Sequence, residues 1–150
     1  MGRCSFKMPE DFLLKVSRLN EKTDEILPRV LEAGGQVVLE RVKSNLSAVV
    51  GKGTKVPSRS TGELESALGI SPAKPKRDGS GWDIKVGFAE PRSATRSPGD
   101  GNSNAKIANI LEYGRHGQPP KPFLKPAKTQ SRKACVETMK SKLDEEVRKI

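Results

Sequence analysis

The feature that most constrains the fold is a stripe of small and apolar residues at three- and four-residue spacing, which predicts one long amphipathic helix. The helix is expected to begin near Thr23, a suitable N-cap, and to end near Val49, so it forms a rod about 40 Å long. Pro28 lies close enough to the start to be tolerated. Gly34 and Gly35 either weaken the middle of the helix or let another backbone approach closely, and close packing is the favoured interpretation. The stripe consists of Ile26, Leu27, Val30, Leu31, Gly34, Val37, Val38, Val42, Leu46 and Val49.

Two short helices are predicted outside this rod. The first covers residues 10–19 and is expected to end at Asn20. Its apolar side is formed by Phe12, Leu13, Val16 and Leu19. The second covers residues 62–67, where Ser60 and Glu63 have the spacing of a capping box.

Residues 68–76 and 82–88 are predicted to pair as a β-hairpin, because they flank the turn sequence Arg-Asp-Gly-Ser-Gly. Alternation in the second strand predicts one buried face, formed by Trp82, Ile84, Val86 and Phe88. Pro72 and Pro75 cannot donate to a ladder, so the first strand is expected at an edge of the sheet.

The stretch from residue 105 to residue 127 predicts a helix, a stiff connector and the start of another helix. Apolar spacing supports the first helix, through Ile107, Ile110 and Leu111. This helix is expected to stop at Tyr113 or at Gly114, which suits a left-handed cap. Prolines then hold the connector extended, so that Phe123 arrives as a buried anchor. The final helix is expected over about residues 123–149, with a core-packed stripe of Val136, Met139, Leu143, Val147 and Ile150.

These elements predict an α+β fold, in which a small antiparallel sheet is packed by the long N-terminal helix and the C-terminal helix. A length of 150 residues with 33% hydrophobic content suits a single domain, residues 1–150, with a modest core. Residues 89–104 have little apolar content and are expected to form a mobile loop, and residues 1–8 are expected to be flexible.

The composition also bounds the location and the kind of site. No apolar run approaches a membrane span or the core of a signal peptide, so no membrane contact is expected. Cys4 and Cys135 are too few for a disulfide framework or a thiolate metal site. A reducing compartment, the cytoplasm of the cell that makes the protein, is therefore expected.

The order and spacing of three short motifs resemble a known family. They read Thr-Gly-x-Leu, Glu-aromatic-Gly and Pro-Phe-Leu-basic-Pro, and the residues are Thr61, Gly62, Leu64, Glu112, Tyr113, Gly114, Pro122, Phe123, Leu124 and Pro126. With an amphipathic helix before them, they resemble the head-tail joining, neck and tail-completion proteins of long-tailed bacteriophages, the tail-component family of lambdoid phages.

The resemblance implies a structural virion protein of a phage or prophage, made in the bacterial host cytoplasm. Such a protein would complete the tail or neck at the head-tail junction by assembling as a homo-oligomeric ring around the DNA channel. Its partners would be other tail or neck proteins, and the motif residues would serve structure or interfaces.

Basic residues gather toward the C-terminus, where residues 105–150 hold eleven basic and five acidic side chains of a chain with net charge +10. Six of them have no carboxylate between them in the sequence: Arg115, Lys121, Lys125, Lys128, Arg132 and Lys133. They could face packaged DNA, attract an acidic protein surface, or form a solvated helix face. DNA contact leaves a basic nucleic-acid-binding protein of a mobile element as the alternative function.

Motifs for catalysis or metal binding are incomplete. Asp83 and Lys85 on one predicted strand come nearest to a nuclease site, but no second carboxylate has a suitable strand context. Residues 100–111 begin like a calcium loop but lack its glycine and its final glutamate, and residues 51–54 imitate only part of a phosphate loop. His116 is the only histidine. A nuclease is therefore the third hypothesis, and no enzymatic activity, metal or cofactor is predicted.

Overall fold

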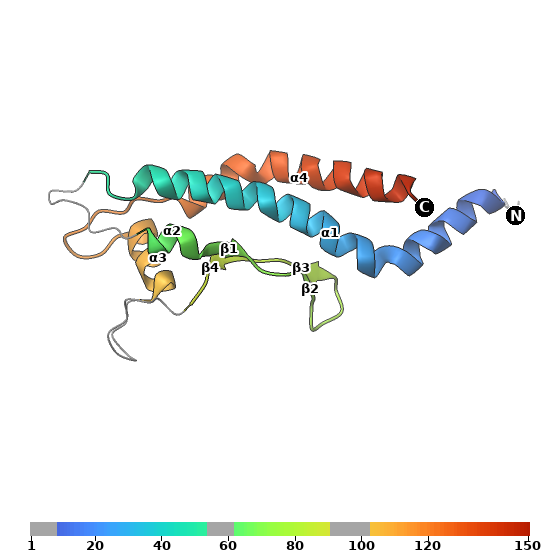
Figure 1. Ribbon diagram of the computed structural model, residues 1–150, viewed down its shortest axis with the longest axis horizontal. Coiled ribbons are helices and arrows are strands. Elements are labelled where there is room, and N and C mark those ends of the chain that lie inside the picture. Colours follow the sequence, from blue (N-terminus) through green and yellow to red (C-terminus); the bar gives the residue numbers. More distant parts are fainter. Residues whose placement is uncertain (1–8, 54–61, 91–102) are drawn as a thin grey trace, which may run out of the picture.

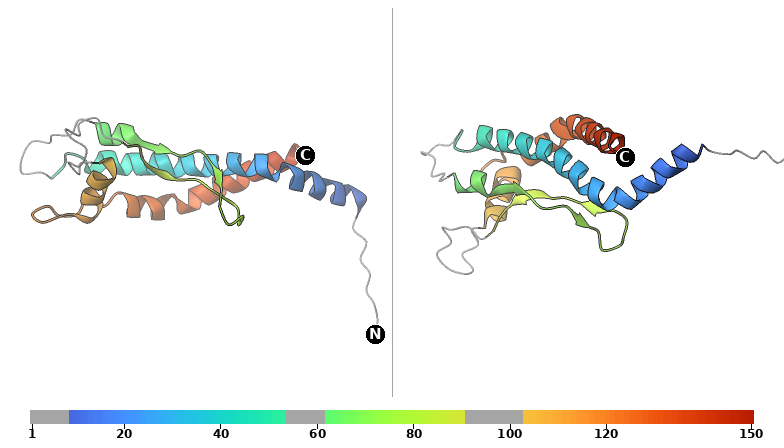
Figure 2. Two further views of the ribbon diagram at one scale, coloured as in Figure 1. Left: turned by 90° about the horizontal axis from the view of Figure 1, so that it is seen from below. Right: turned by 45° about the vertical axis from the view of Figure 1, so that its right-hand side comes forward.

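The computed structural model describes residues 9–53, 62–90 and 103–150. Two long helices, α1 (Glu10–Val49) and α4 (Leu124–Arg148), lie side by side and make the most extensive contact between any two elements (Figure 1). The strands lie along the opposite side of α1 in Figure 1 and in the right-hand view of Figure 2. The protein therefore has the α+β fold that the sequence predicts, with a small antiparallel sheet and two packed terminal helices.

Helix α1 is one continuous helix of 40 residues, so the predicted end at Asn20 and second start near Thr23 are wrong. Asn20 disfavours a helix only mildly, and Thr23 does not act as a cap because its hydroxyl donates to the Leu19 carbonyl at 2.8 Å. Pro28 lies well inside the helix, where its missing N–H and its ring favour a kink. Figure 1 shows α1 bent in its N-terminal half, which directs its first turns away from the other elements.

The two glycines of α1 allow the close packing that the sequence predicts, but the neighbouring atoms belong to side chains and not to another backbone. A Cβ atom added at Gly34 would lie 2.5 Å from Cγ of Met139 on α4. A Cβ atom added at Gly35 would collide with Cδ1 of Ile70 on the other side of the helix. Helix α1 is therefore held between α4 and the strands at this point.

The predicted hairpin is present, but it forms two short antiparallel ladders in place of one. The outer pair joins β1 to β4 and the inner pair joins β2 to β3; these strands are β1 (Leu68–Ile70), β2 (Lys74–Pro75), β3 (Trp82–Asp83) and β4 (Val86–Phe88). Ser71 bridges the gap, since its N–H donates to the Lys85 carbonyl at 2.8 Å and its hydroxyl accepts from the Lys85 N–H at 3.0 Å. Pro72 follows without an N–H to donate, so the ladder cannot continue there. The expected buried face is only half-buried.

The core lies where α1, α4, the strands and two short helices meet. The short helices are α2 (Glu63–Ala67) and α3 (Asn104–Tyr113). The buried apolar cluster consists of Val42, Leu46, Leu64, Ala108, Phe123 and Ala127. Phe123, the expected anchor, is fully buried, and its ring meets Phe88 edge to face with centroids 6.2 Å apart.

Two further expectations change in detail, and others lie outside the described residues. Helix α2 begins one residue later than predicted, at Glu63, after Gly62 with φ 76°; Ser60 of the proposed capping box lies outside the described residues. Ser103 caps α3 by accepting from the Lys106 N–H, and Asn104 is buried, so neither belongs to the predicted loop. The rest of that loop from residue 91, and the expected flexible segment 1–8, also lie outside the described residues.

The predicted core stripe of α4 is partly wrong. Val136, Leu143 and Val147 are 40%, 38% and 42% exposed. Helix α1 covers one side of α4, and no other element of the described residues makes an extensive contact with α4. None of the helices in the described ranges has the length and apolarity that a membrane span requires.

Candidate functional site

A buried carboxylate joins the end of α3 to the start of α4. Glu112 is only 4% exposed, and its Oε2 atom accepts from the backbone N–H groups of Phe123 and Leu124, both at 2.8 Å. Its Oε1 atom accepts from the Lys125 N–H at 2.9 Å. The first N–H groups of a helix have no partner within the helix, and the helix N-terminus carries a partial positive charge. Glu112 therefore caps α4 from outside that helix, which links the Glu-Tyr-Gly and Pro-Phe-Leu motifs physically.

The environment of Glu112 keeps this carboxylate charged. Burial by itself would raise the pKa of Glu112. The three backbone donors and the nearby Lys125 ammonium act in the opposite sense and bring the pKa of Glu112 below the ordinary glutamate value. The cap is therefore present at neutral pH as an anion.

Gly114 makes the turn out of α3 possible. Its φ is 78° and its ψ is 178°, so the predicted positive φ is present, although ψ lies outside the left-handed helical region. A Cβ atom there would lie 2.8 Å from the Gln118 carbonyl oxygen and 2.9 Å from the Pro120 nitrogen. The connector then returns to α3, where the Lys121 N–H donates to the Leu111 carbonyl at 2.7 Å. Glycine is the residue that fits both this conformation and this space.

Above the capped junction lies a groove of about 500 Å³, here called the α3–α4 groove. Its walls come from α1, β4, the end of α3 and the first half of α4, and its lining residues are Val38, Val42, Val86, Glu112, Tyr113, Leu124, Lys125, Lys128, Ser131, Arg132, Cys135 and Val136. Five of these twelve residues are aliphatic, and Lys125, Lys128 and Arg132 supply positive charge. The groove therefore combines an apolar surface with a basic rim.

Tyr113 stands at the edge of this groove and is 63% exposed. The Lys125 ammonium lies 5.3 Å from the centre of its ring, a distance that allows a cation–π interaction. In the described part of the chain, no carboxylate lies within ion-pair distance of Lys125, Lys128 or Arg132. These three charges are available to a partner.

The six basic residues grouped by sequence do not form one surface. Helical spacing brings Lys125, Lys128 and Arg132 to the groove, whereas Lys133 lies 4.0 Å from Glu137 as an exposed pair. The Lys121 ammonium donates to the Lys52 carbonyl. Arg115 pairs through its backbone with Gln118 in the exposed turn after α3.

The remaining predicted site residues do not line the groove. Gly62 precedes α2, and Leu64 is buried in the same cluster as Phe123. Thr61 lies outside the described residues. Pro122 and Pro126 flank the start of α4, where Pro126 is tolerated because the first turn needs no donor from it.

The two residues that come nearest to a nuclease motif do not lie on one strand. Asp83 ends β3, but Lys85 lies between β3 and β4, so the expectation of one shared strand is wrong. His116 is exposed in the turn after α3. Within the described residues, no group of three His, Cys, Asp or Glu side chains is placed to hold a metal ion.

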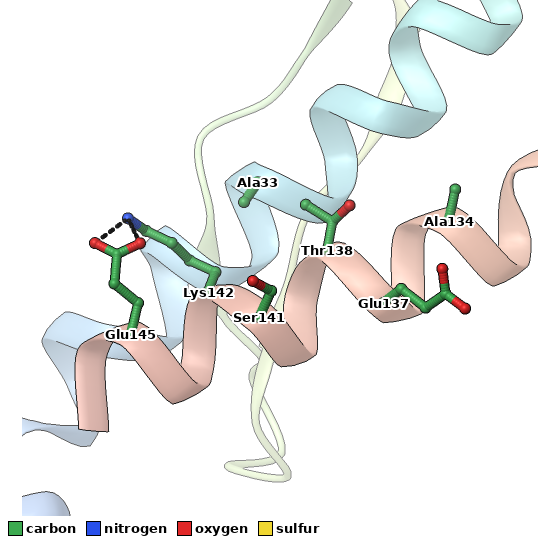
Figure 3. A pocket seen from close by; sticks show the side chains of 7 residues that line it. All are labelled: Ala33, Ala134, Glu137, Thr138, Ser141, Lys142 and Glu145. Atoms are coloured by element: carbon green, nitrogen blue, oxygen red, sulfur yellow. Dashed lines mark hydrogen bonds and ion pairs between the residues drawn. The ribbon is translucent and has the colours of Figure 1, made fainter. Parts of the chain in front are cut away.

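A second hollow, of about 440 Å³, runs along the contact between α1 and α4. Figure 3 shows Ala33 of α1 facing a row of small or polar side chains on α4. Lys142 reaches toward Glu145, and Nζ lies 3.2 Å from its carboxylate (Figure 3). The charge of Lys142 is thus already paired, and this hollow is a solvated helix contact.

The other exposed apolar surface is the N-terminal arm, defined here as residues 10–19 of α1. It extends past the C-terminal end of α4 in Figure 1 and in the right-hand view of Figure 2. Arg18 marks its departure from α4, since its guanidinium donates to the Ile150 carbonyl at 3.4 Å. Four large apolar side chains of the arm are 47–56% exposed: Phe12, Leu13, Leu14 and Val16.

Sequence reasoning found most of these residues but missed how they act. It assigned Glu112 to a motif without seeing the helix cap, because the cap depends on a fold-back across the connector. It also missed the groove, whose walls come from four separate elements. The three- and four-residue spacing of Lys125, Lys128 and Arg132 is the signal that predicts their common face.

Residues 10–114, more than two thirds of the chain, match the family model described as "Bacteriophage HK97-gp10, putative tail-component". The match begins at the first residue of α1 and ends at Gly114, so it includes the Thr-Gly and Glu-Tyr-Gly motifs and precedes α4. No curated protein and no solved structure matches the chain. The chain belongs to the HK97-gp10-like family of phage tail components.

Proposed function

We propose that this protein is a structural virion component that completes the tail or neck at the head-tail junction. Copies of the chain assemble as a ring around the DNA channel and contact other tail or neck proteins. The protein is made in the bacterial host cytoplasm and acts in the virion of a long-tailed phage or prophage.

The apolar surface left exposed on two separate elements carries this proposal. The N-terminal arm exposes four large apolar side chains, and α4 exposes Val136, Leu143 and Val147. Exposed apolar side chains gathered on one element mark interaction sites more often than they mark ordinary solvent-facing surface. A tail component that meets its partners only during assembly requires such surfaces.

The capped junction supports the same proposal in a different way. Glu112 and Phe123 fix the direction in which α4 leaves the connector, so the apolar faces of α1 and α4 keep one relative arrangement. A joining protein needs this rigidity, because contacts repeated around a ring must have the same geometry in each copy.

Removal of the gene from the phage or prophage that encodes this protein tests the proposal. Electron microscopy of the lysate should show filled heads and separate tails, and expression of the intact chain in trans should restore joined particles. An antibody label on complemented particles should lie at the head-tail junction. Joined, infectious particles from the deletion strain would contradict the proposed function.

A nucleic-acid-binding protein of a mobile element is the second candidate, because the three groove cations have no carboxylate partner among the described residues. A dedicated DNA-binding protein should bind duplex DNA with a dissociation constant on the order of 10⁻⁸ M and with sequence preference. A tail component with incidental DNA contact should bind only on the order of 10⁻⁴ to 10⁻⁶ M, with strong dependence on salt. A titration of the purified chain with duplex DNA at two salt concentrations separates the two.

A further inference from the structure

We propose that the N-terminal arm of one copy of this chain occupies the α3–α4 groove of the next copy. This inference rests on the proposed ring assembly and names the contact that would build it. It follows from four properties of the arm and of the groove: an unpartnered apolar face, their separation within one chain, their shapes and their charges.

The arm has the pattern of a helix that docks in a groove. Phe12, Val16 and Leu19 recur at four- and three-residue spacing, which places them on one face, and Leu13 borders that face. Phe12 and Val16 are 52% and 47% exposed, although α1 is helical throughout this segment. The arm is therefore already folded, and docking would bury this face without first ordering a flexible segment.

The arm and the groove of one chain lie too far apart to meet. Val42 lines the groove and belongs to the same continuous helix as Phe12. The stretch of helix between them measures about 45 Å along its axis. An arm that occupies the α3–α4 groove must therefore belong to another copy of the chain. A contact between two different surfaces of identical chains is heterologous, and it closes into a ring where the rotation between copies allows it.

The groove matches the arm in shape and in chemistry. Its volume of about 500 Å³ lies within the roughly 300–1,000 Å³ of small-molecule pockets, so it can receive apolar side chains from one face of a helix but not a whole helix. Val38, Val86 and Leu124 present aliphatic surface within it. Every buried side-chain nitrogen or oxygen in the described residues has a hydrogen-bond partner, so no buried polar group in the groove needs a polar ligand.

The charge of the first turn of the arm is complementary to that of the rim. This turn carries Glu10 and Asp11, directly before Phe12, whereas the basic residues of the arm, Lys15 and Arg18, follow further along. The groove rim carries Lys125, Lys128 and Arg132 with no ion-pair partner among the described residues. Placing the acidic first turn of the arm at the basic rim, with Lys15 and Arg18 further from it, fixes the orientation of this pairing.

Cysteine cross-linking tests the contact directly, because Cys135 lines the groove. In a Cys4→Ser background, Phe12→Cys and Val16→Cys variants are oxidised at mildly alkaline pH, since burial raises the pKa of Cys135. We expect a ladder of covalent multimers from at least one of the two variants, both from the purified multimer and from particles. The matched control is Leu14→Cys, an equally exposed position that lies about 200° around the helix from Phe12.

Three results would overturn the inference. One is equal cross-linking from the Leu14→Cys control, and another is cross-linking of the arm to a different tail protein. The third is assembly into the junction with no cross-link to Cys135, which would leave the proposed function standing. Absence of the chain from particles, together with absence of cross-links, would instead contradict both proposals.

Charge reversal distinguishes a docked arm from bound DNA as the occupant of the basic rim. Lys128→Glu with Arg132→Glu should abolish multimers, and so should Glu10→Lys with Asp11→Lys. Combining all four substitutions in one chain should restore multimers, because the two charged surfaces are again complementary. Loss of DNA binding in the groove variant, with no recovery of multimers in the combined variant, would assign the rim to DNA and overturn the docking proposal.

Discussion

The two ends of α1 differ in how far their apolar side chains are buried within the chain. Near the C-terminal end, Val42 and Leu46 pack in the buried cluster with Phe123, and Glu112 caps the neighbouring helix. Near the N-terminal end, Phe12 and its apolar neighbours are about half exposed. The difference indicates that the C-terminal end stabilises the fold, and we propose that the N-terminal end is left for partners. Substitutions at the two ends should therefore change different measurements.

The largest loss of stability is expected from Phe123→Ala. This change empties a fully buried site and should lower the free energy of unfolding by about 3–5 kcal/mol, as measured by urea denaturation. Leu14→Ala in the exposed arm is the control and should change the free energy of unfolding by less than about 0.5 kcal/mol. Equal losses from the two variants would remove the distinction between the two ends.

Removal of the helix cap should have the next largest effect. Glu112→Ala leaves the three backbone donors at the start of α4 without their acceptor and should cost roughly 1–3 kcal/mol. Hydrogen exchange should show that the loss of protection is concentrated in the first turn of α4. Unchanged protection of Leu124 and Lys125 would show that water replaces the carboxylate without loss.

Two glycines in the same turn allow a matched comparison. Gly114 and Gly117 both have positive φ, but a Cβ atom would meet backbone atoms only at Gly114. Gly114→Ala should therefore cost roughly 1–3 kcal/mol, through strain and displacement of the connector. Gly117→Ala should cost about 1 kcal/mol or less, through strain alone. Thermal denaturation of the two variants measures the difference, and a larger loss at Gly117 would contradict this account of the turn.

The charge of Glu112 predicts a dependence of stability on pH. The pKa of Glu112 is lowered in the folded chain, so its contribution is fully present above the unfolded-state pKa of glutamate and is lost as pH falls through the folded-state pKa. The stability difference between the native chain and a Glu112→Gln variant should therefore shrink on acidification below about pH 4. Urea denaturation at several pH values tests this prediction, and a difference that grows on acidification would reverse the sign assigned to the cap.

The smallest effect on stability is expected at the exposed apolar face of α4. Leu143→Ser and Val147→Ser should each change the free energy of unfolding by no more than about 0.5 kcal/mol, because both side chains are about 40% exposed and neither lines the groove. Their effect should instead be on incorporation into particles, measured by quantitative mass spectrometry. Normal incorporation of both variants would restrict the assembly surfaces to the arm and the groove.

The sequence was sufficient for most of the elements, because their signals are local. The three- and four-residue spacing predicted α1 beyond Thr23, α3 and α4, and the glycine-rich turn predicted the hairpin. Gly34 and Gly35 also predicted close packing correctly. The helices and the hairpin depend on residues that are near one another in the sequence. The two glycines signal close packing because glycine is otherwise unfavourable inside a helix.

The remaining features depend on tertiary structure. Asn20 and Thr23 resembled a helix boundary, but their weak preferences yielded to the surrounding helix-forming residues. The apolar stripe of α4 predicted burial, yet periodicity alone cannot say whether the covering surface belongs to the same chain or to another. For the same reason, the cap by Glu112 and the α3–α4 groove required the folded arrangement.

Incorporation of two arm variants into particles tests the division between the stabilising end and the assembling end most directly. Phe12→Asp and Leu14→Asp place the same charge at two exposed positions of the same helix, and both variants should unfold at the same temperature as the native chain. The account predicts that Leu14→Asp is present in purified particles at the native copy number and that Phe12→Asp is absent from them. Native copy number of Phe12→Asp at an unchanged unfolding temperature would contradict the account.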